Sequence, residues 1–224
     1  MTPHIWVPEP WTDAAALELP SQTLHHLARV LRLSDGARLS YTDGAGTTGE
    51  GVLSGRFVTR GEETSVPRSA PLEMAVAPPH RVERVRFLVE KLTELGVTGL
   101  VWVKTQRSQK APPPEKKVQN WVIGAVEQSR RAWAPTISGP VALDELEGPL
   151  AVAQPGAPSG SWDELALSSA MFVVGPEGGL TATDLESING RQVAQFGLGR
   201  AILRTETAVL AIAASVRAVR GWSD

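Results

Sequence analysis

The spacing of hydrophobic positions changes near residue 70, and this change divides the chain into two predicted parts. In the first part, short apolar segments alternate with Gly, Asp and Pro turns, which is typical of β-strands. The strand segments are Ile5–Val7, Ala37–Tyr41 and Gly51–Val58. One helix is also predicted there, over Ser21–Leu33, because apolar residues recur at helical spacing. Residues 1–68 are therefore expected to form a small β-rich domain.

A proline-containing linker, Val66–Pro71, separates this part from a second with a different pattern. From Leu72 onward, short apolar strands alternate with amphipathic helices, which predicts a mostly parallel α/β sheet in a domain of residues 72–224. The predicted strands are Leu72–Ala77, Gly99–Val103, Leu150–Ala153, Met171–Val174 and Gln192–Leu198. The predicted helices are Arg81–Leu95, Glu115–Arg131, Thr181–Asn189 and Thr205–Arg220.

Composition narrows the possible functions mainly by exclusion. The chain has no cysteine, which excludes disulfides, thiolate zinc sites, iron–sulfur clusters and a cysteine nucleophile. No apolar run approaches the about 20 residues that span a bilayer, and no signal peptide is recognisable. We therefore expect a cytoplasmic protein with no membrane contact. Two adjacent histidines, His25 and His26, point apart on a helix and do not predict a metal site.

Charge is unevenly distributed along the chain. The net charge is −2, but residues 71–131 carry 11 Lys/Arg and 6 Asp/Glu, a balance of +5. This segment either forms a local basic face or is an ordinary solvated helix surface, and the second interpretation is favoured. Charge alone does not identify a nucleic-acid-binding protein.

A glycine-rich segment, Gly44–Gly49, has the GxGxxG spacing of dinucleotide-binding loops. That motif requires a strand before it and a helix after it, so that the helix N-terminus meets the pyrophosphate. Here the following residues, Glu50–Val58, are predicted to be a strand. The segment is therefore interpreted as a β-hairpin loop whose glycines supply positive φ angles.

The strongest local signal is Gly175-Pro176-Glu177-Gly178-Gly179, which lies between an apolar strand and a helix start. In open α/β sheets, ligands bind where loops leave the carboxyl ends of strands. Adjacent glycines also leave the backbone accessible to a ligand. On these residues alone, a ligand loop and a purely structural turn are equally supported.

A second candidate segment, Leu198–Thr207, joins a predicted strand to the final helix. Thr205 is expected to cap that helix, and Glu206 to lie in its first turn, where the helix dipole favours an acid. In the functional interpretation, Gly199–Leu203 forms a second wall of a ligand site and Arg204 places a permanent cation at its edge.

Several of these segments together resemble one family, the bacterial RsmE-type 16S ribosomal RNA uridine-N3 methyltransferases of the SPOUT superfamily. The matching segments occur in the family's order along nearly the whole chain. They are His25–Leu33, Glu90–Val97, Gln106–Ser108, Glu127–Arg131, Val174–Leu180 and Leu198–Thr207. Each is weak alone, but six in this order are difficult to explain by chance.

The resemblance implies a fold and a set of functional residues. It implies an N-terminal PUA-like β-barrel, a C-terminal α/β domain with a deep trefoil knot, and a homodimer. It implies S-adenosylmethionine as cofactor and ribosomal RNA or the small ribosomal subunit as partner, without a metal. The implied cofactor residues are Val174, Gly175, Pro176, Glu177, Gly178, Gly179, Leu198, Gly199, Ala201, Ile202, Leu203 and Thr205. The implied RNA-binding residues are Arg29, Arg32, Arg107, Arg130 and Arg131.

Two positions agree less well with the family. The loop after Ala153, which would form a third cofactor wall, reads Gln154-Pro155-Gly156 and is carried over only weakly. A basic residue often precedes the family's first strand, whereas this chain has His4 there. A phosphate contact at His4 would depend on pH.

The expected chemistry is methyl transfer to uracil N3, which must lose its proton and be unpaired. Arg204 is expected to stabilise negative charge on the uracil oxygens, and Glu206 or Glu177 to accept the proton. Three alternatives remain. They are another SPOUT methyltransferase acting on tRNA or a ribose hydroxyl, a non-catalytic RNA-binding protein, and a nucleotide-phosphate enzyme using residues 175–179. No GxxxxGK[ST] segment supports the last.

Overall fold

The computed structural model describes residues 2–8, 11 and 14–222. These residues form two compact units that do not follow a simple division of the sequence. One unit contains the residues up to Ser69 together with Ile123–Ala134, and the other contains Ala70–Val122 and the residues from Pro135 onward.

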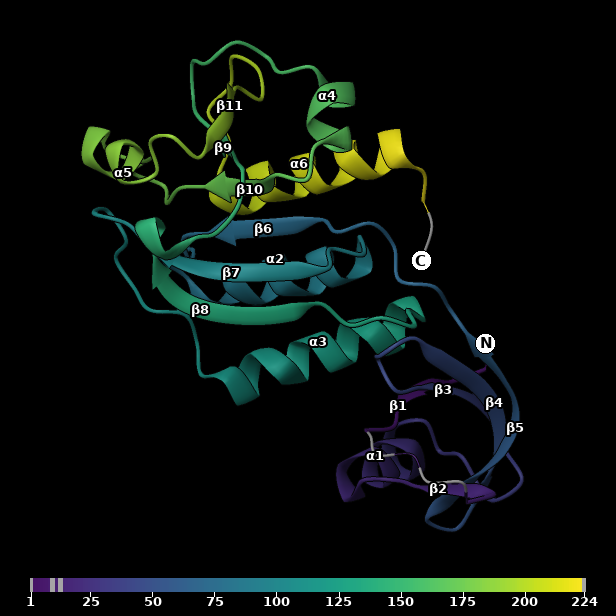
Figure 1. Cartoon of the computed structure of the whole chain (residues 1–224). Coiled ribbons are helices and arrows are strands. Elements are labelled where there is room, and N and C mark those ends of the chain that lie inside the picture. The colour runs from purple at the N-terminus through teal and green to yellow at the C-terminus, as the bar shows by residue number, and fades with distance from the viewer. Residues whose placement is uncertain (1, 9–10, 12–13, 223–224) are drawn as a thin grey trace. The chain divides into compact units, whose positions relative to one another are not determined.

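The N-terminal unit is built on a mixed sheet of five strands (Figure 1). Its strand order is β1-β3-β4-β5-β2, with β1 parallel to β3 and the other neighbours antiparallel. The elements are β1 His4–Trp6, β2 Ala16–Glu18, α1 Ser21–His25, the π-helical turn η1 His26–Val30, β3 Arg38–Thr42, β4 Thr47–Ser54 and β5 Phe57–Ser65. Ile5, Leu27, Leu39, Tyr41 and Val58 are buried in its core.

Two sequence expectations in this unit are wrong in detail. Gly51–Val58 is not one strand, because the chain reverses between β4 and β5 at Gly55, whose φ of +58° suits glycine. The helical period also changes at His26, where the Leu31 N–H donates to the His26 carbonyl five residues earlier, at 3.1 Å. Leu31 is therefore 41% exposed, although a regular helix over the predicted range Ser21–Leu33 would place it on the same face as the buried Leu27.

The segment Gly44–Gly49 is a hairpin loop and the start of β4, as predicted. Gly44 and Gly46 have φ angles of +71° and +110°, which other residues rarely adopt. The loop is closed by residues far along the chain, since the Gly46 N–H donates to the Ala132 carbonyl at 3.0 Å and the Ala134 N–H to the Gly44 carbonyl at 2.9 Å. Its glycines thus serve packing in this unit.

The C-terminal unit contains a parallel sheet of six strands in the order β11-β9-β10-β6-β7-β8. The strands are β6 Glu73–Val76, β7 Gly99–Lys104, β8 Thr136–Ala142, β9 Leu150–Ala153, β10 Met171–Val174 and β11 Gln192–Phe196. The helices are α2 Val82–Glu94, α3 Glu115–Ser129, η2 Leu143–Glu145, α4 Trp162–Leu167, α5 Ala182–Ser187 and α6 Thr205–Arg220. Of α3, the residues up to Val122 belong to this unit.

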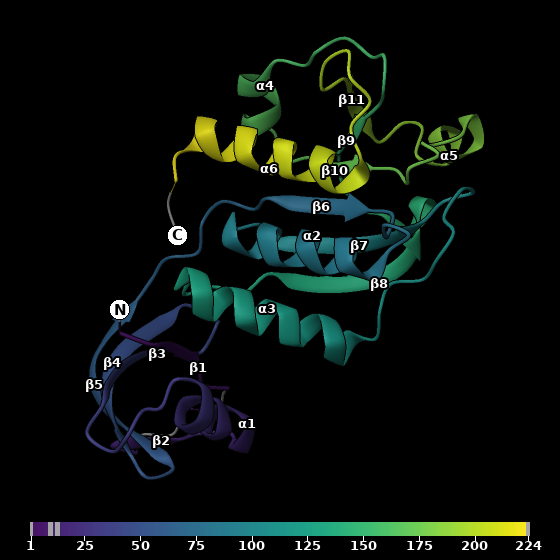
Figure 2. The same ribbon diagram turned by 180° about the vertical axis from the view of Figure 1, so that it is seen from behind.

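Helices cover both faces of this sheet. Figure 2 shows α2 and α6 in front of it, and these two helices contact each other directly. On the other face, Leu143 of η2, Leu146 directly after it and Ile188 directly after α5 pack with strand residues such as Ala75 and Val152. Burial on both faces explains why β9 and β10, and β6 after its exposed Glu73, are continuous apolar runs without polar alternation.

Candidate functional site

A pocket opens at the carboxyl ends of three neighbouring strands, β11, β9 and β10. Each strand sends out a loop there, and residues of all three loops line the pocket. Gln154 follows β9, Gly175 follows β10, and Leu198 lies between β11 and α6. Since parallel strands end at the same edge of a sheet, this topology brings together segments that are distant in sequence.

The lining contains every residue expected to bind the cofactor except Gly178. Gln154 and Pro155 of the weakly expected third wall also line it, whereas Gly156 does not. Ala153, Leu180 and Ala208 line it too, although sequence reasoning did not name them. Two of the three could have been anticipated, because Leu180 directly follows the glycine-rich segment and Ala208 lies one helical turn after Thr205.

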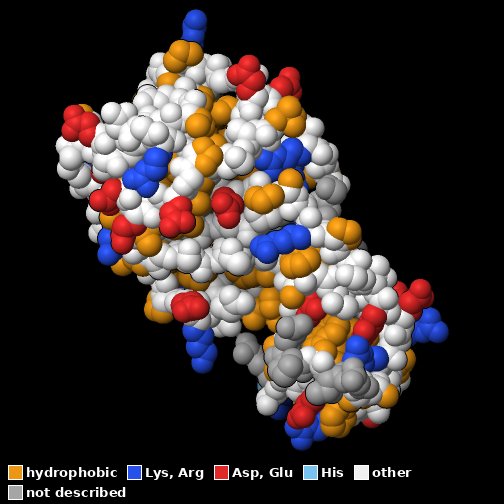
Figure 3. Space-filling model, in the orientation of Figure 1, with side chains coloured by type: hydrophobic (Ala, Val, Ile, Leu, Met, Phe, Trp, Pro, Cys, Tyr) orange, Lys and Arg blue, Asp and Glu red, His pale blue; other side chains and the backbone are white. Residues whose placement is uncertain are grey.

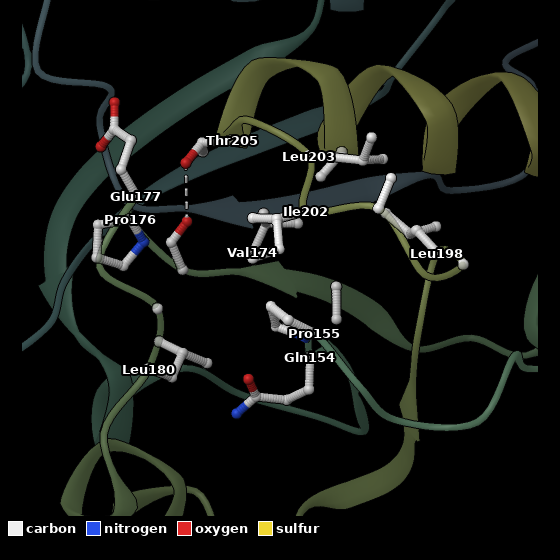
Figure 4. A pocket seen from close by; sticks show the side chains of 16 residues that line it. Gln154, Pro155, Val174, Pro176, Glu177, Leu180, Leu198, Ile202, Leu203 and Thr205 are labelled. Atoms are coloured by element: carbon white, nitrogen blue, oxygen red, sulfur yellow. Dashed lines mark hydrogen bonds between the residues drawn. The ribbon is translucent and has the colours of Figure 1, made fainter.

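The inner surface is mostly aliphatic, with bare backbone between the side chains. Figure 4 shows Val174, Leu198, Leu203 and Leu180 arranged around the cavity together with Pro155. Gly175 and Gly199 contribute backbone without side chains. Such a site can hold a flat, largely apolar group and bond its polar edges to main-chain N–H and C=O groups.

Thr205 has a different role from the one expected. It is the first residue of α6, whereas the residue in the capping position is Arg204, which makes no side-chain capping bond. The Thr205 hydroxyl donates instead to the Gly175 carbonyl at 3.1 Å, as the dashed line in Figure 4 shows. The hydroxyl therefore ties the start of α6 to the glycine-rich loop.

The glycine-rich loop fits closely against its neighbours. A Cβ atom on Gly175 would lie 2.9 Å from the Leu180 side chain, too close for any residue but glycine without movement. Gly178 packs against Arg107 instead, where an added Cβ would lie 3.2 Å from Arg107 Cδ, and its carbonyl accepts a hydrogen bond of 2.5 Å from Arg107. This explains why Gly178 is the one expected cofactor residue outside the lining.

The Gln106–Ser108 segment, after β7, packs against the end of the same loop. Besides the Arg107 bond, the Gln106 N–H donates to the Asp184 carboxylate at 3.0 Å, and Gln106 Oε1 accepts from the Thr181 hydroxyl at 3.1 Å. Asp184 and Thr181 form a capping box at the start of α5. The Gln106–Ser108 segment is thus bonded both to the glycine-rich loop and to the start of α5.

The two residues expected to be catalytic lie in different surroundings. Arg204 is exposed at the end of the pocket loop. Glu206 lies in the first turn of α6, as expected, but is only 7% exposed and does not line the pocket. Its carboxylate instead faces Arg84 of α2, with Glu206 Oε1 3.5 Å from Arg84 Nε.

Four of the arginines expected to bind RNA lie in the N-terminal unit. Arg29, Arg32 and Arg130 are exposed, and Arg131 is half-buried. Arg130 and His4 line a shallow cleft of this unit. Burial and the nearby Arg130 lower the pKa of His4 from 6.5 to about 4, so its imidazole is neutral near pH 7. His4 therefore does not replace the family's basic residue as a cation.

Features of other kinds of site are missing from the described part of the chain. Within residues 2–8, 11 and 14–222, no three His, Asp or Glu side chains are grouped as metal ligands. None of the described helices is long and apolar enough to cross a membrane. On the face shown in Figure 3, Lys and Arg side chains are scattered among acidic ones, which agrees with a solvated surface there.

Known proteins are similar to this chain in both sequence and structure. Residues 67–217 match the RNA methyltransferase domain family. The ribosomal RNA small subunit methyltransferase E of a Synechocystis species is 28% identical over 92% of this chain and 74% of its own length.

Two solved structures are similar over the whole chain. A methyltransferase from Legionella pneumophila, solved with bound S-adenosylmethionine, has a TM-score of 0.83 and 26% identity, covering 97% of this chain and 98% of that one. The small subunit methyltransferase E of Neisseria gonorrhoeae, also solved with S-adenosylmethionine, has a TM-score of 0.82 and 26% identity, covering 98% of each chain. These matches confirm the predicted fold class, a PUA-like domain with a SPOUT α/β domain. The chain therefore belongs to the RNA methyltransferase family and, within it, to the RsmE type.

Proposed function

We propose that this protein transfers a methyl group from S-adenosylmethionine to N3 of a uridine in 16S ribosomal RNA of the small subunit. The observation that carries the proposal is the pocket at the ends of β9, β10 and β11. The loops that follow these three strands all line this one site, and the sequence predicted two of them, after β10 and β11, as cofactor-binding segments. Its aliphatic lining and bare glycine backbone suit an adenosyl group.

The cofactor supplies an electrophilic methyl group, and the protein's own residues position the acceptor. Arg204 is the proposed partner of the uracil oxygens, because it is exposed directly beside the pocket residues Leu203 and Thr205. A fixed cation there stabilises the negative charge that develops as N3 loses its proton. Glu206 and Glu177 are the two candidate proton acceptors, and both contact the same arginine, Arg84.

For the RNA, we propose that residues 1–68 dock the substrate and residues 72–224 carry the transferase site. The proposed phosphate contacts are Arg29, Arg32, Arg107, Arg130 and Arg131. Of these, Arg107 is also joined to the glycine-rich loop through Gly178. RNA bound at Arg107 would therefore lie next to the cofactor loop.

We also propose a homodimer that needs no metal. Large apolar side chains are exposed on the adjacent helices α2 and α6, including Phe87 at 45% and Val219 at 38%. Exposed apolar side chains on neighbouring elements are typical of subunit interfaces. Turnover should be unchanged in EDTA.

The direct test is methylation of small ribosomal subunits or 16S RNA with purified protein and S-adenosylmethionine. Mass spectrometry of nuclease digests should find one new base-methylated uridine, absent without the protein. Methylation of a ribose, or of tRNA in preference to ribosomal RNA, would contradict the uridine-N3 assignment. Binding of RNA without any methyl transfer would contradict the enzymatic assignment.

A further inference from the structure

Arg84 lies between two carboxylates, one in the glycine-rich loop of the pocket and one in the first turn of α6. It is in the first turn of α2, with Nε 3.5 Å from Glu206 Oε1 and Nη1 3.8 Å from Glu177 Oε1. Glu177 belongs to the glycine-rich loop after β10, and Glu206 follows the loop that ends in Arg204. One guanidinium thus contacts both segments that flank the cofactor site.

The contact with Glu206 is the better anchored of the two. The Glu206 side chain is 9% exposed, compared with 28% for Arg84 and 37% for Glu177. Its second oxygen, Oε2, is buried without a hydrogen-bond partner among the described residues. A buried carboxylate is costly without a compensating cation, and Arg84 supplies one.

The contact with Glu177 acts on the loop and not on the interior of the pocket. Figure 4 shows the Glu177 carboxylate directed away from the aliphatic side chains that surround the cavity. Glu177 Oε1 also accepts from the His80 N–H at 3.4 Å, just before α2. The side chain therefore holds the loop toward α2, while neighbouring loop residues line the pocket.

We propose that Arg84 is a positioning residue for the methyl-donor pocket. It is anchored on the buried Glu206 and holds the glycine-rich loop in place through Glu177. This inference rests on the proposed function, because it takes S-adenosylmethionine as the ligand of the pocket. Arg84 does not line that pocket, so it acts through the loop and does not contact the ligand itself.

Two ligands separate positioning from simple charge compensation. S-adenosylmethionine carries a positive sulfur, whereas S-adenosylhomocysteine lacks the methyl group and that charge. If Arg84 positions the loop, its loss weakens both ligands by the same factor, because both share the adenosyl part. If Arg84 only neutralises nearby carboxylates, its loss leaves more negative charge at the site and shifts affinity toward the cationic ligand.

The experiment measures both dissociation constants by isothermal titration calorimetry for wild type, Arg84→Met, Arg84→Met/Glu206→Gln and Arg86→Met. Arg86 is the matched control, since it lies on the same helix and pairs with Glu90 at 2.7 Å. We expect Arg84→Met to weaken both ligands by about tenfold. Arg86→Met should bind both like wild type.

The double variant removes the buried unpaired carboxylate along with its cation. It should recover the thermal stability lost in Arg84→Met but keep the weakened affinities, because Glu177 still lacks its partner. If Arg84→Met does not fold, the double variant alone provides the affinity comparison. Wild-type affinities in the double variant, or a changed preference between the two ligands, would overturn the inference. Failure of the wild-type protein to bind either ligand would instead contradict the proposed function.

Discussion

Arg204 and Glu206 are two positions apart, yet only Arg204 is exposed beside the pocket. Arg204 also makes no side-chain capping bond at the start of α6, so replacing it should leave the helix intact. Replacing it should instead remove a cation from the site where negative charge develops on the uracil.

We expect Arg204→Ala to lower the methylation rate by about 100-fold or more, since it removes transition-state stabilisation. The affinity for S-adenosylmethionine should stay within about twofold of wild type, because the Arg204 side chain is not part of the pocket lining. Single-turnover methylation assays and calorimetry measure the two effects separately. Near-normal turnover in this variant would refute the assignment of Arg204.

His4 provides a prediction on pH. Its pKa is about 4 in the folded protein, against an ordinary value of 6.5, because burial and the nearby Arg130 disfavour the charged form. Between pH 6.5 and 4 the unfolded chain therefore binds more protons at this residue than the folded chain. The His4 contribution to stability is present above pH 6.5 and is lost as the pH falls toward 4.

The comparison is between wild type and His4→Gln, by urea denaturation at pH 7.5 and pH 5.0. The free energy of unfolding should fall more for wild type than for the variant over this interval, since glutamine does not titrate. Equal decreases in both proteins would show that folding does not lower the pKa of His4.

Among the secondary-structure elements, α2 and α6 are joined by a buried arginine near the end of α6. Arg217 is 2% exposed, and its Nε donates to the Leu95 carbonyl at 3.0 Å while Nη2 donates to the Gly96 carbonyl. These carbonyls follow the end of α2, where Gly96 has a φ of +71°. The side chain therefore satisfies acceptors that helix geometry leaves without partners.

Replacing this residue should destabilise the C-terminal unit. We expect Arg217→Met to lower the free energy of unfolding by about 3 kcal/mol, because two buried carbonyls lose their charged donor. Ala218→Gln, at an exposed position of the same helix, should change it by less than about 0.5 kcal/mol. Chemical denaturation monitored by circular dichroism measures both, and equal effects would argue against the cap.

The elements predicted well from sequence are those with the strongest hydrophobic pattern. The bounds of β9, β10 and α6 agree with the prediction, and α2 differs by one residue at each end. Three elements of the C-terminal unit were not predicted, β8, η2 and α4. β8 lies at the edge of the sheet, is at most half-buried and contains Gly139-Pro140, so its apolar signal is weak.

In the site, too, residues with a strong local sequence pattern were predictable and residues without one were not. The walls of the pocket were predictable because glycine-rich segments followed apolar strands, and strand ends are where ligands bind in such sheets. Arg84 was not predictable, because nothing in its local pattern distinguishes it from Arg81 or Arg86. Its importance arises only from the packing of α2 against the start of α6, a contact between residues 122 positions apart in sequence.

For the whole molecule, the proposed dimer depends on the apolar side chains exposed on α2 and α6. We expect Phe87→Glu to give a monomer in solution, because a buried carboxylate at a subunit interface lacks compensation. Light scattering should then report half the wild-type mass. Val193→Glu is the matched control, since Val193 is 59% exposed on β11, and it should keep the wild-type mass.

The N-terminal unit includes Ile123–Ala134, and this has a consequence for how the protein is made. A ribosome synthesises residues 1–69 first, but the chain stretch that supplies the Trp133 indole to the Val66 carbonyl and the Glu127 carboxylate to the Trp6 N–H emerges much later. Residues up to Ser69 therefore remain incompletely packed while β6, α2 and β7 are translated. Nascent-chain proteolysis should show protection of the N-terminal region only after residue 134 has left the exit tunnel.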